Sequence, residues 1–242
     1  MLSKTDLITP AWSCPDNVVA YTSTRNGGIS RGIYEGLNVG AHVGDDLAVV
    51  KQNRSKLPHS SKITWLEQVH GCTVATLPTT AITADAAYTD KPEQFCAVMT
   101  ADCVPILLCD TAGSEVAAVH AGWKGLDIKI IAETLRCFSN SPSSIMAWIG
   151  PAICNKCYEV DSGVAFRFSQ YDGVVTPSKN SDKYYLNLPL IAQLQLNSLG
   201  VNQVTQSCLC TYCESHMFYS HRKATHDNAK GTGRIVSAIG FR

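Results

Sequence analysis

The sequence predicts an α/β (α+β) protein in which mixed β-sheets and helices form a single-domain sandwich. Short apolar runs of strand composition are interleaved with three or four helical patterns, and hairpins occur among the strands. No G-x-G-x-x-G or Walker pattern is present, so nothing supports a dinucleotide-binding or P-loop fold. A chain of 242 residues can bury one sizeable core, and it shows no internal repeat, linker or low-complexity tract. We therefore predict one domain over residues 1–242.

Before residue 100, the sequence indicates one helix and several strands. Asp45 or Asp46 is a candidate N-cap for a helix that continues to about Leu57. Strands are expected at the β-rich or apolar runs Val18–Ser23, Val74–Leu77 and Phe95–Met99.

The stretch from Thr100 to Gly125 predicts a β-hairpin. Val104–Cys109 and Glu115–His120 are apolar runs, and the DTAGS sequence between them has turn chemistry. The start of one antiparallel strand lies beside the end of the next, so residues at the open end of this hairpin are expected to converge.

After the hairpin, Lys124–Phe138 has the spacing of an amphipathic helix. Two later helices are expected to begin at caps Asp161 and Asn187 and to end near Tyr171 and Leu199. Further strands are expected at Ser143–Gly150, Val204–Ser207, Met217–His221 and Ile235–Phe241, with a polar loop at Thr225–Lys230.

Composition excludes several classes of function. Hydrophobic residues make up 45% of the chain and charged residues 17%, which favours a globular enzyme over a disordered or scaffold protein. The formal net charge is zero and no Lys/Arg run stands out, so we expect no nucleic-acid partner. The N-terminal sequence has no continuous apolar stretch, so we expect no signal peptide, no membrane association and a cytoplasmic location. No feature of the sequence predicts an oligomeric state.

The eleven cysteines are expected to be reduced, as thiols are in the cytosol. Most are interpreted as small buried apolar residues. Two clusters stand apart, and either a second, structural metal site or chance in a Cys-rich chain explains them. They are Cys154 with Cys157, and Cys208 with Cys210 and Cys213.

Three side chains form a candidate metal centre. Cys103 begins the first hairpin strand, His120 ends the second, and His70 closes the earlier apolar segment Ile63–Val69. One thiolate and two imidazoles suit a borderline-soft metal and leave a fourth position open. The alternative is a small buried cysteine with hydrogen-bonded histidines, because no pair has C-x-x-C or H-E-x-x-H spacing.

The motifs of this chain resemble those of one bacterial family, in family order from Thr24 to Arg234. The matching segments are TRNGGIS at 24–30, GLNVGAHVGDD at 36–46, QVHG at 68–71, ADA at 84–86, TADCVPILLCD at 100–110, AAVHAGWKG at 117–125, WIGPAI at 148–153, YEV at 158–160 and TGR at 232–234. The chain is thereby similar to the laccase-domain or polyphenol-oxidase-like family, also described as purine nucleoside phosphorylases and as a peptidoglycan editing factor. The resemblance implies one zinc per chain, held by His70, Cys103 and His120. Of the two cysteine clusters, it covers only Cys210.

Other residues are candidates for chemistry or for binding. Asp102, together with the three ligand candidates, is predicted to be catalytic, and it or Asp85 could orient an imidazole or take a proton. Turn or capping duty is the alternative for both carboxylates. The predicted substrate- or phosphate-binding residues are Arg25, Asn38, His42, Arg54 and Lys124. For the arginines, the alternative is a solvated surface position.

Three functions compete. The resemblance implies a zinc enzyme acting on purine nucleosides and phosphate, by phosphorolysis of adenosine and inosine and by adenosine deamination. A hydrolase that edits peptidoglycan precursors could use the same residues, with Cys103 as its nucleophile. A copper-dependent polyphenol oxidase is the third, but the seven histidines contain no His-x-His pair.

Overall fold

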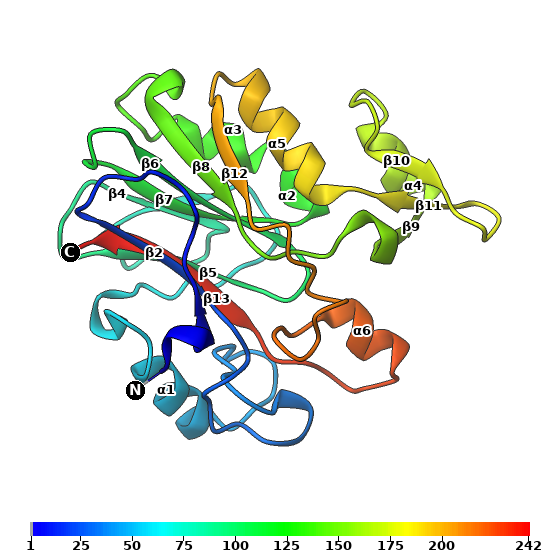
Figure 1. Ribbon diagram of the computed structural model, residues 1–242, viewed down its shortest axis with the longest axis horizontal. Helices are drawn as coiled ribbons and strands as arrows, with labels where there is room; N and C mark the ends of the chain where they lie inside the picture. Colours follow the sequence, from blue (N-terminus) through cyan, green and yellow to red (C-terminus); the bar gives the residue numbers. More distant parts are fainter. Residues whose placement is uncertain (1) are drawn as a thin grey trace.

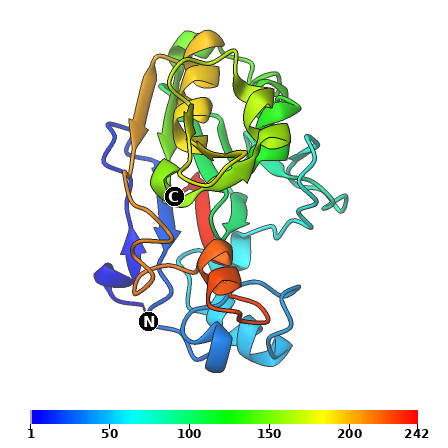
Figure 2. The same ribbon diagram turned by 90° about the vertical axis from the view of Figure 1, so that its right-hand side faces the viewer.

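The computed structural model describes residues 2–242. Two stacked β-sheets lie between a layer of helices and a second layer, which consists mostly of loops and also holds the helix Leu47–Ser55 (Figures 1 and 2). The strands are β1 (Leu7–Ile8), β2 (Val18–Ser23), β3 (Val74–Thr76), β4 (Ala86–Thr89), β5 (Phe95–Thr100), β6 (Val104–Asp110), β7 (Val116–Ala121), β8 (Ile145–Ile149), β9 (Glu159–Asp161), β10 (Val175–Pro177), β11 (Lys183–Leu186), β12 (Gln203–Gln206) and β13 (Ile235–Phe241). The α-helices are α1 (Leu47–Ser55), α2 (Trp123–Asp127), α3 (Ile130–Leu135), α4 (Ser162–Ala165), α5 (Leu188–Ser198) and α6 (His221–His226).

The largest sheet is mixed and has the order β12-β8-β6-β7-β4-β3. The two outer pairs, β12 with β8 and β3 with β4, are parallel, and the inner pairs are antiparallel. A four-stranded sheet, β1-β2-β13-β5, packs against one face, and a small sheet, β10-β11-β9, lies to one side beside α4 (Figure 1). The predicted mixed-sheet α/β class is confirmed.

Apolar side chains fill both sides of the largest sheet. On one side, Leu107 and Trp148 pack in one cluster with Val98 and Ile239 of the four-stranded sheet. On the other side, α2, α3 and α5 cover the sheet with a second cluster that includes Leu126, Ile130 and Ile191. Because both faces are covered, every residue of β6 and β7 is buried, and these two strands are a rigid base for whatever their ends carry.

The predicted hairpin is confirmed. β6 and β7 pair antiparallel, with Val104 opposite Ala121 and Pro105 opposite His120. The predicted helix caps at Asp46 and Asn187 are confirmed too, because each side chain accepts a backbone N–H of the first turn.

Two predicted elements are wrong in detail. The helix expected over Lys124–Phe138 is two helices, because Lys129 between them adopts a left-handed φ of 68°. The spacing could not reveal this break, since apolar residues on both sides of it are buried in one cluster. Met217–His221 is not a strand: Met217 ends a turn, the next three residues belong to no helix or strand, and His221 begins α6. Ser220 caps that helix by accepting the N–H of Lys223.

The segment expected after Asp161 is also shorter than predicted. α4 ends at Ala165 and a 3₁₀ turn over Phe166–Phe168 follows it. Of the expected polar loop Thr225–Lys230, the first two residues belong to α6. None of the helices within residues 2–242 combines the length and the apolar character that crossing a membrane requires.

Glu115, at the tip of the hairpin, is a buried charged residue whose carboxylate is stabilised by hydrogen bonds. Its buried carboxylate accepts hydrogen bonds from the Tyr88 hydroxyl at 2.5 Å, the Ser139 N–H at 2.8 Å and the Asn140 side-chain amide at 2.9 Å. Burial alone would raise the pKa of Glu115, but these donors outweigh it and lower the pKa.

We expect Glu115→Gln to destabilise the protein by about 1–3 kcal/mol at pH 7, because an amide cannot replace an ionised acceptor. A lowered native pKa stabilises the fold above the ordinary glutamate pKa of about 4.3, and the stability is lost as pH falls through and below that value. Urea unfolding at several pH values should therefore show that the difference in unfolding free energy between variant and wild type becomes smaller in acid. The exposed Glu93→Gln is the control. A constant difference between Glu115→Gln and wild type across the pH range would contradict this account.

Candidate metal centre

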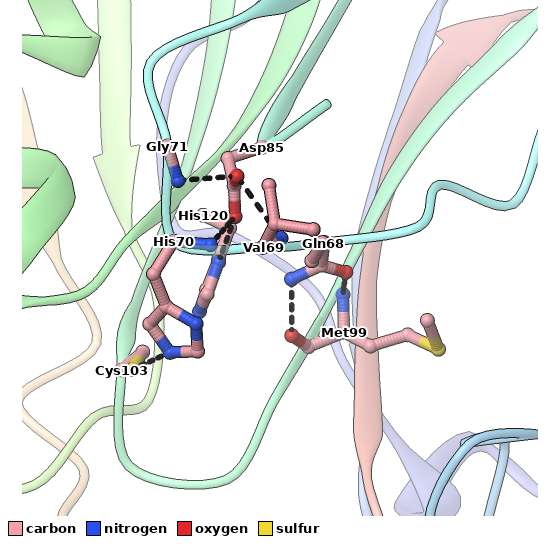
Figure 3. Close-up of polar contacts among 8 residues, drawn as sticks. All are labelled: Gln68, Val69, His70, Gly71, Asp85, Met99, Cys103 and His120. Carbon is pink, nitrogen blue, oxygen red and sulfur yellow. Dashed lines mark hydrogen bonds and ion pairs between the residues drawn. The ribbon is translucent and has the colours of Figure 1, made fainter. Parts of the chain in front are cut away.

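The open end of the β6–β7 hairpin brings the three predicted ligands together. The Cys103 thiol immediately precedes β6, and His120 is the penultimate residue of β7. His70 comes from the connection before β3 and has a left-handed φ of 61°. Its Nε2 lies 3.9 Å from Cys103 Sγ, and its ring meets that of His120 edge-on with centroids 4.7 Å apart (Figure 3). The three potential ligand atoms all lie within 4.8 Å of one another.

Asp85, which precedes β4, holds two of these ligands in place. Its fully buried carboxylate accepts the backbone N–H groups of Val69, His70 and Gly71 at 3.2, 2.9 and 2.6 Å. The same carboxylate lies 2.8 Å from His120 Nδ1 (Figure 3). An ionised carboxylate only accepts, so Nδ1 carries a proton, and Nε2 is the ring nitrogen that remains for a metal.

The charges in this centre reinforce one another. Burial alone would raise the pKa of Cys103, but the charge and hydrogen bonding of His120 and His70 outweigh it and lower the pKa to about 6. Burial alone would lower the pKa of His120, but the Cys103 thiolate and the Asp85 carboxylate raise it to about 9. The centre thus favours a thiolate with positive charge beside it, and a divalent cation supplies such charge.

The surroundings fit a bound metal ion. A Cβ on Gly122 would lie 3.0 Å from Cys103 Sγ and 3.2 Å from His70 Cδ2, so only glycine lets both ligands approach the chain here. One thiolate and two imidazoles from three separate segments form a three-ligand set that leaves a coordination position for a substrate or water.

The centre lies in a cleft of about 370 Å³. One wall is fixed by Gln68, whose side-chain amide bonds both backbone groups of Met99, at 2.7 and 2.8 Å (Figure 3). The hydroxyl of Thr100, also on the lining, is buried and has no hydrogen-bond partner among the described residues. The remaining lining consists of His42, Ala101, Asp102, Trp123, Tyr158, His221, Arg222 and Arg234 around the three ligand candidates.

Asp102 adjoins the centre but its oxygens are engaged elsewhere. The buried carboxylate accepts the Thr211 hydroxyl at 2.7 Å and the Arg222 N–H at 2.6 Å. It ties two later segments to the start of β6 and makes no hydrogen bond with His70 or His120. The sequence offered imidazole orientation, proton transfer or a turn or capping role for Asp102, and the observed hydrogen bonds are of the structural kind.

Of the five predicted substrate- or phosphate-binding residues, only His42 lines the cleft. The Arg25 guanidinium donates to the carbonyls of Glu35 and Ser215 and borders a different hollow. Lys124 is exposed and lies over the ring of Trp123.

Asn38 and Arg54 do not line the cleft, although each contacts a residue that does. The buried Asn38 side chain bonds the Asp45 carboxylate and accepts the Arg234 N–H. The Arg54 guanidinium donates to the Val39 carbonyl at 2.9 Å and stacks 3.8 Å from the Trp65 ring. Both hydrogen-bond sets are internal, which explains why these polar residues are buried or half-buried.

Sequence reasoning missed several residues of the lining as individual candidates: Gln68, Tyr158, His221, Arg222 and Arg234. Gln68, Tyr158 and Arg234 lie in the motifs QVHG, YEV and TGR, whereas His221 and Arg222 begin α6. For Gln68, Tyr158 and Arg234, membership of a family motif was the available signal.

Comparisons with known proteins agree along nearly the whole chain. Residues 19–242 match a family described as multi-copper polyphenol oxidoreductase laccase. A relative from Escherichia coli named purine nucleoside phosphorylase YfiH is 43% identical over 96% of this chain and 98% of its own length. A purine nucleoside phosphorylase from Haemophilus influenzae is 41% identical, over 97% of this chain and 98% of its own.

Solved structures show the same fold. A Neisseria meningitidis protein of the DUF152 family superposes with a TM-score of 0.89 and 36% identity, over 98% of this chain and 99% of its own. YlmD from Geobacillus stearothermophilus gives a TM-score of 0.87 and 30% identity, over 100% of this chain and 98% of its own.

Proposed function

Because the chain belongs to the multi-copper polyphenol oxidoreductase laccase family, whose matched relatives include proteins named purine nucleoside phosphorylase, we propose that it is an enzyme of that type. The observation that carries the proposal is the convergence of His70, Cys103 and His120 on one cleft, with His120 held by Asp85. Its substrates are a purine nucleoside and phosphate. Adenosine deamination in the same cleft is the finer part of the proposal.

We assign zinc, not copper, to the three ligands. A multicopper centre needs several histidine-rich sites. Among the described residues only one cluster combines histidine with cysteine, and it offers two imidazoles and one thiolate. When bound, zinc supplies Lewis acidity that polarises a substrate oxygen or lowers the pKa of water.

The cleft supplies binding groups of two kinds. Met99, Trp123 and Tyr158 offer apolar and aromatic surface for a purine ring. Arg222 and Arg234 bring positive charge to the same lining, which suits a phosphate dianion. Phosphorolysis forms a bond between a phosphate oxygen and ribose C1′ and breaks the bond from C1′ to the purine nitrogen. The electron pair of that bond leaves with the base, which then takes up a proton.

A metal-free cysteine hydrolase is the second candidate, and one observation favours it. Cys103 has a pKa lowered to about 6 with two imidazoles beside it, as an activated nucleophile requires. This reading suits removal of an amino acid from a peptidoglycan precursor. Chelation separates the two candidates, because only the zinc enzyme needs a metal.

The decisive experiment incubates the protein with inosine or adenosine, with and without phosphate. We expect free base and ribose 1-phosphate only when phosphate is present, and inosine from adenosine without it. Both activities should be lost after chelation and regained with zinc. No turnover of any purine nucleoside, together with release of an amino acid from a muropeptide precursor, would contradict the proposal.

Arg234 tests where phosphate binds. We expect Arg234→Ala to raise the phosphate concentration needed for half-maximal phosphorolysis by about tenfold to a hundredfold, because a charge-assisted contact contributes about 1.5–3 kcal/mol. The same change at the exposed Lys124 should have little effect. An unaltered phosphate requirement in Arg234→Ala, or a large change in Lys124→Ala, would place phosphate elsewhere.

A further inference from the structure

Four cysteines outside the cleft converge in the fold, and we call them the cysteine quartet. Their potential ligand atoms all lie within 4.8 Å of one another. Cys157 Sγ and Cys213 Sγ are 3.4 Å apart, and neither thiol is part of a disulfide. The quartet consists of two C-x-x-C pairs, Cys154 with Cys157 and Cys210 with Cys213.

Sheet topology explains how segments 56 residues apart meet. β8 and β12 are parallel neighbours, with Ile149 opposite Gln206, so the loops after both strands leave the same edge of the sheet. The pairing continues past the strands, because Ala152 exchanges hydrogen bonds with the chain on either side of Cys210, at 3.2 Å each.

The backbone around the quartet is arranged for a charged sulfur. The N–H groups of Cys154 and Cys213 both point to Cys210 Sγ, at 3.3 and 3.4 Å. Each C-x-x-C pair lies on a tight turn: a 3₁₀ turn covers Asn155–Cys157, and residues 211–214 form another turn. Two donors on one sulfur from opposite loops favour its thiolate form, which is the form that binds metals.

We propose that the cysteine quartet binds a structural zinc ion, separate from the ion of the cleft. Four sulfurs at 2.3 Å from a tetrahedral zinc lie about 3.8 Å from one another, which agrees with the observed spacing. A polynuclear iron–sulfur cluster divides its cysteines among several irons and spreads them farther apart. A disulfide between Cys157 and Cys213 would use only half of the quartet. With four protein ligands the site is closed, and it has no position for a substrate.

The site lies where it can stabilise the cleft. The first loop of the quartet leads directly to Tyr158, on the cleft lining. The Ile153 N–H donates to the Asp102 carbonyl, and the Thr211 hydroxyl, within the second loop, donates to the Asp102 carboxylate. An ion that joins the two loops therefore holds in place the two segments that donate hydrogen bonds to Asp102, one through Ile153 and one through Thr211. The proposal does not depend on the reaction catalysed in the cleft.

Metal content, measured on protein purified with zinc and a reductant, tests this inference. We expect about two zinc ions per wild-type chain and about one in the double variant Cys157→Ser/Cys213→Ser. Cys103→Ala should also hold about one, because it keeps the quartet. Cys208→Ser is the matched control, since Cys208 is an exposed neighbour outside the quartet. Loss of the quartet ion should lower the midpoint of thermal unfolding, whereas Cys208→Ser should not.

A measurement on the unaltered protein covers the case in which the double variant does not fold. Native mass spectrometry should find two zinc ions per chain, and cobalt(II) exchanged into Cys103→Ala should show the charge-transfer absorption of a tetrathiolate site. A single zinc in wild type that disappears in Cys103→Ala would overturn the inference. So would a Cys157–Cys213 disulfide in protein kept under reductant. A failed nucleoside assay with two zinc ions present would overturn only the proposed function.

Discussion

Cys103→Ala is expected to remove the proposed zinc ion from the cleft and to lower the proposed inosine phosphorolysis by on the order of a thousandfold, equivalent to about 4 kcal/mol of transition-state stabilisation. The thiolate is the only anionic ligand of the three, and its loss leaves two imidazoles from separate segments. The fold should persist, because Cys103 is half-buried at a strand end and its loss leaves no buried charge without a partner.

The measurements are zinc content, steady-state rate and urea unfolding of the same preparation. Cys137→Ala is the control, since this half-buried thiol lies two residues after α3 and does not line the cleft. Full zinc occupancy in Cys103→Ala would contradict the ligand assignment. Activity that survives chelation in wild type but disappears in Cys103→Ala would transfer the site to cysteine nucleophilic chemistry.

Asp85→Asn is expected to cost about 3–5 kcal/mol of stability at neutral pH, because it removes one partner of a buried charge pair. The carboxylate accepts hydrogen bonds from three backbone N–H groups and from His120 Nδ1. The asparagine NH₂ is itself a donor, so it would lie against some of these donors without forming hydrogen bonds to them. Affinity for zinc should fall by about tenfold to a hundredfold, since both His70 and His120 lose their orientation.

The pH dependence of this variant has a definite sign. Burial alone would raise the pKa of Asp85, but the hydrogen bond and charge of His120 and the N–H donors of the loop outweigh it and lower the pKa. The stabilisation is therefore present above the ordinary aspartate pKa of about 3.9 and is lost as pH falls through and below that value. Urea unfolding should show the difference between wild type and variant narrowing in acid. Asp90→Asn, at an exposed residue, is the control. Unchanged stability of Asp85→Asn at pH 7 would show that the Asp85 carboxylate does not stabilise the fold through these hydrogen bonds.

Local features of the chain were sufficient to predict most of the sheet and to select the three ligand candidates that the fold brings together. β2, β5, β6, β7 and β13 lie where apolar runs between turn sequences indicated them, because strand formation here follows burial. Antiparallel hairpin geometry was enough to predict that Cys103 and His120 approach each other, since it depends only on neighbouring residues in sequence. His70 was selected as a candidate because it ends an apolar segment, and the resemblance to the family implies the same residue.

Long-range packing decided the rest. Asp85 was one of two carboxylate candidates, and only the fold showed that it holds both histidine segments. Arg25, Asn38 and Arg54 were plausible phosphate ligands by residue type, but none of them lines the cleft. The two arginines donate to backbone carbonyls, and the Asn38 amide donates to the Asp45 carboxylate. The break at Lys129 left no mark on the apolar spacing.

The cysteine quartet shows most clearly the difference between what local sequence predicts and what long-range packing decides. In the sequence it is two short pairs of cysteines far apart, which also arise by chance, and nothing local says that they meet. Their contact depends on β8 and β12 being parallel neighbours in one sheet, so that both loops emerge at the same edge. Residue type and local spacing determined which side chains could do chemistry here, whereas strand order determined which of them lie within reach of one another, because that order is fixed by the burial of the whole sheet.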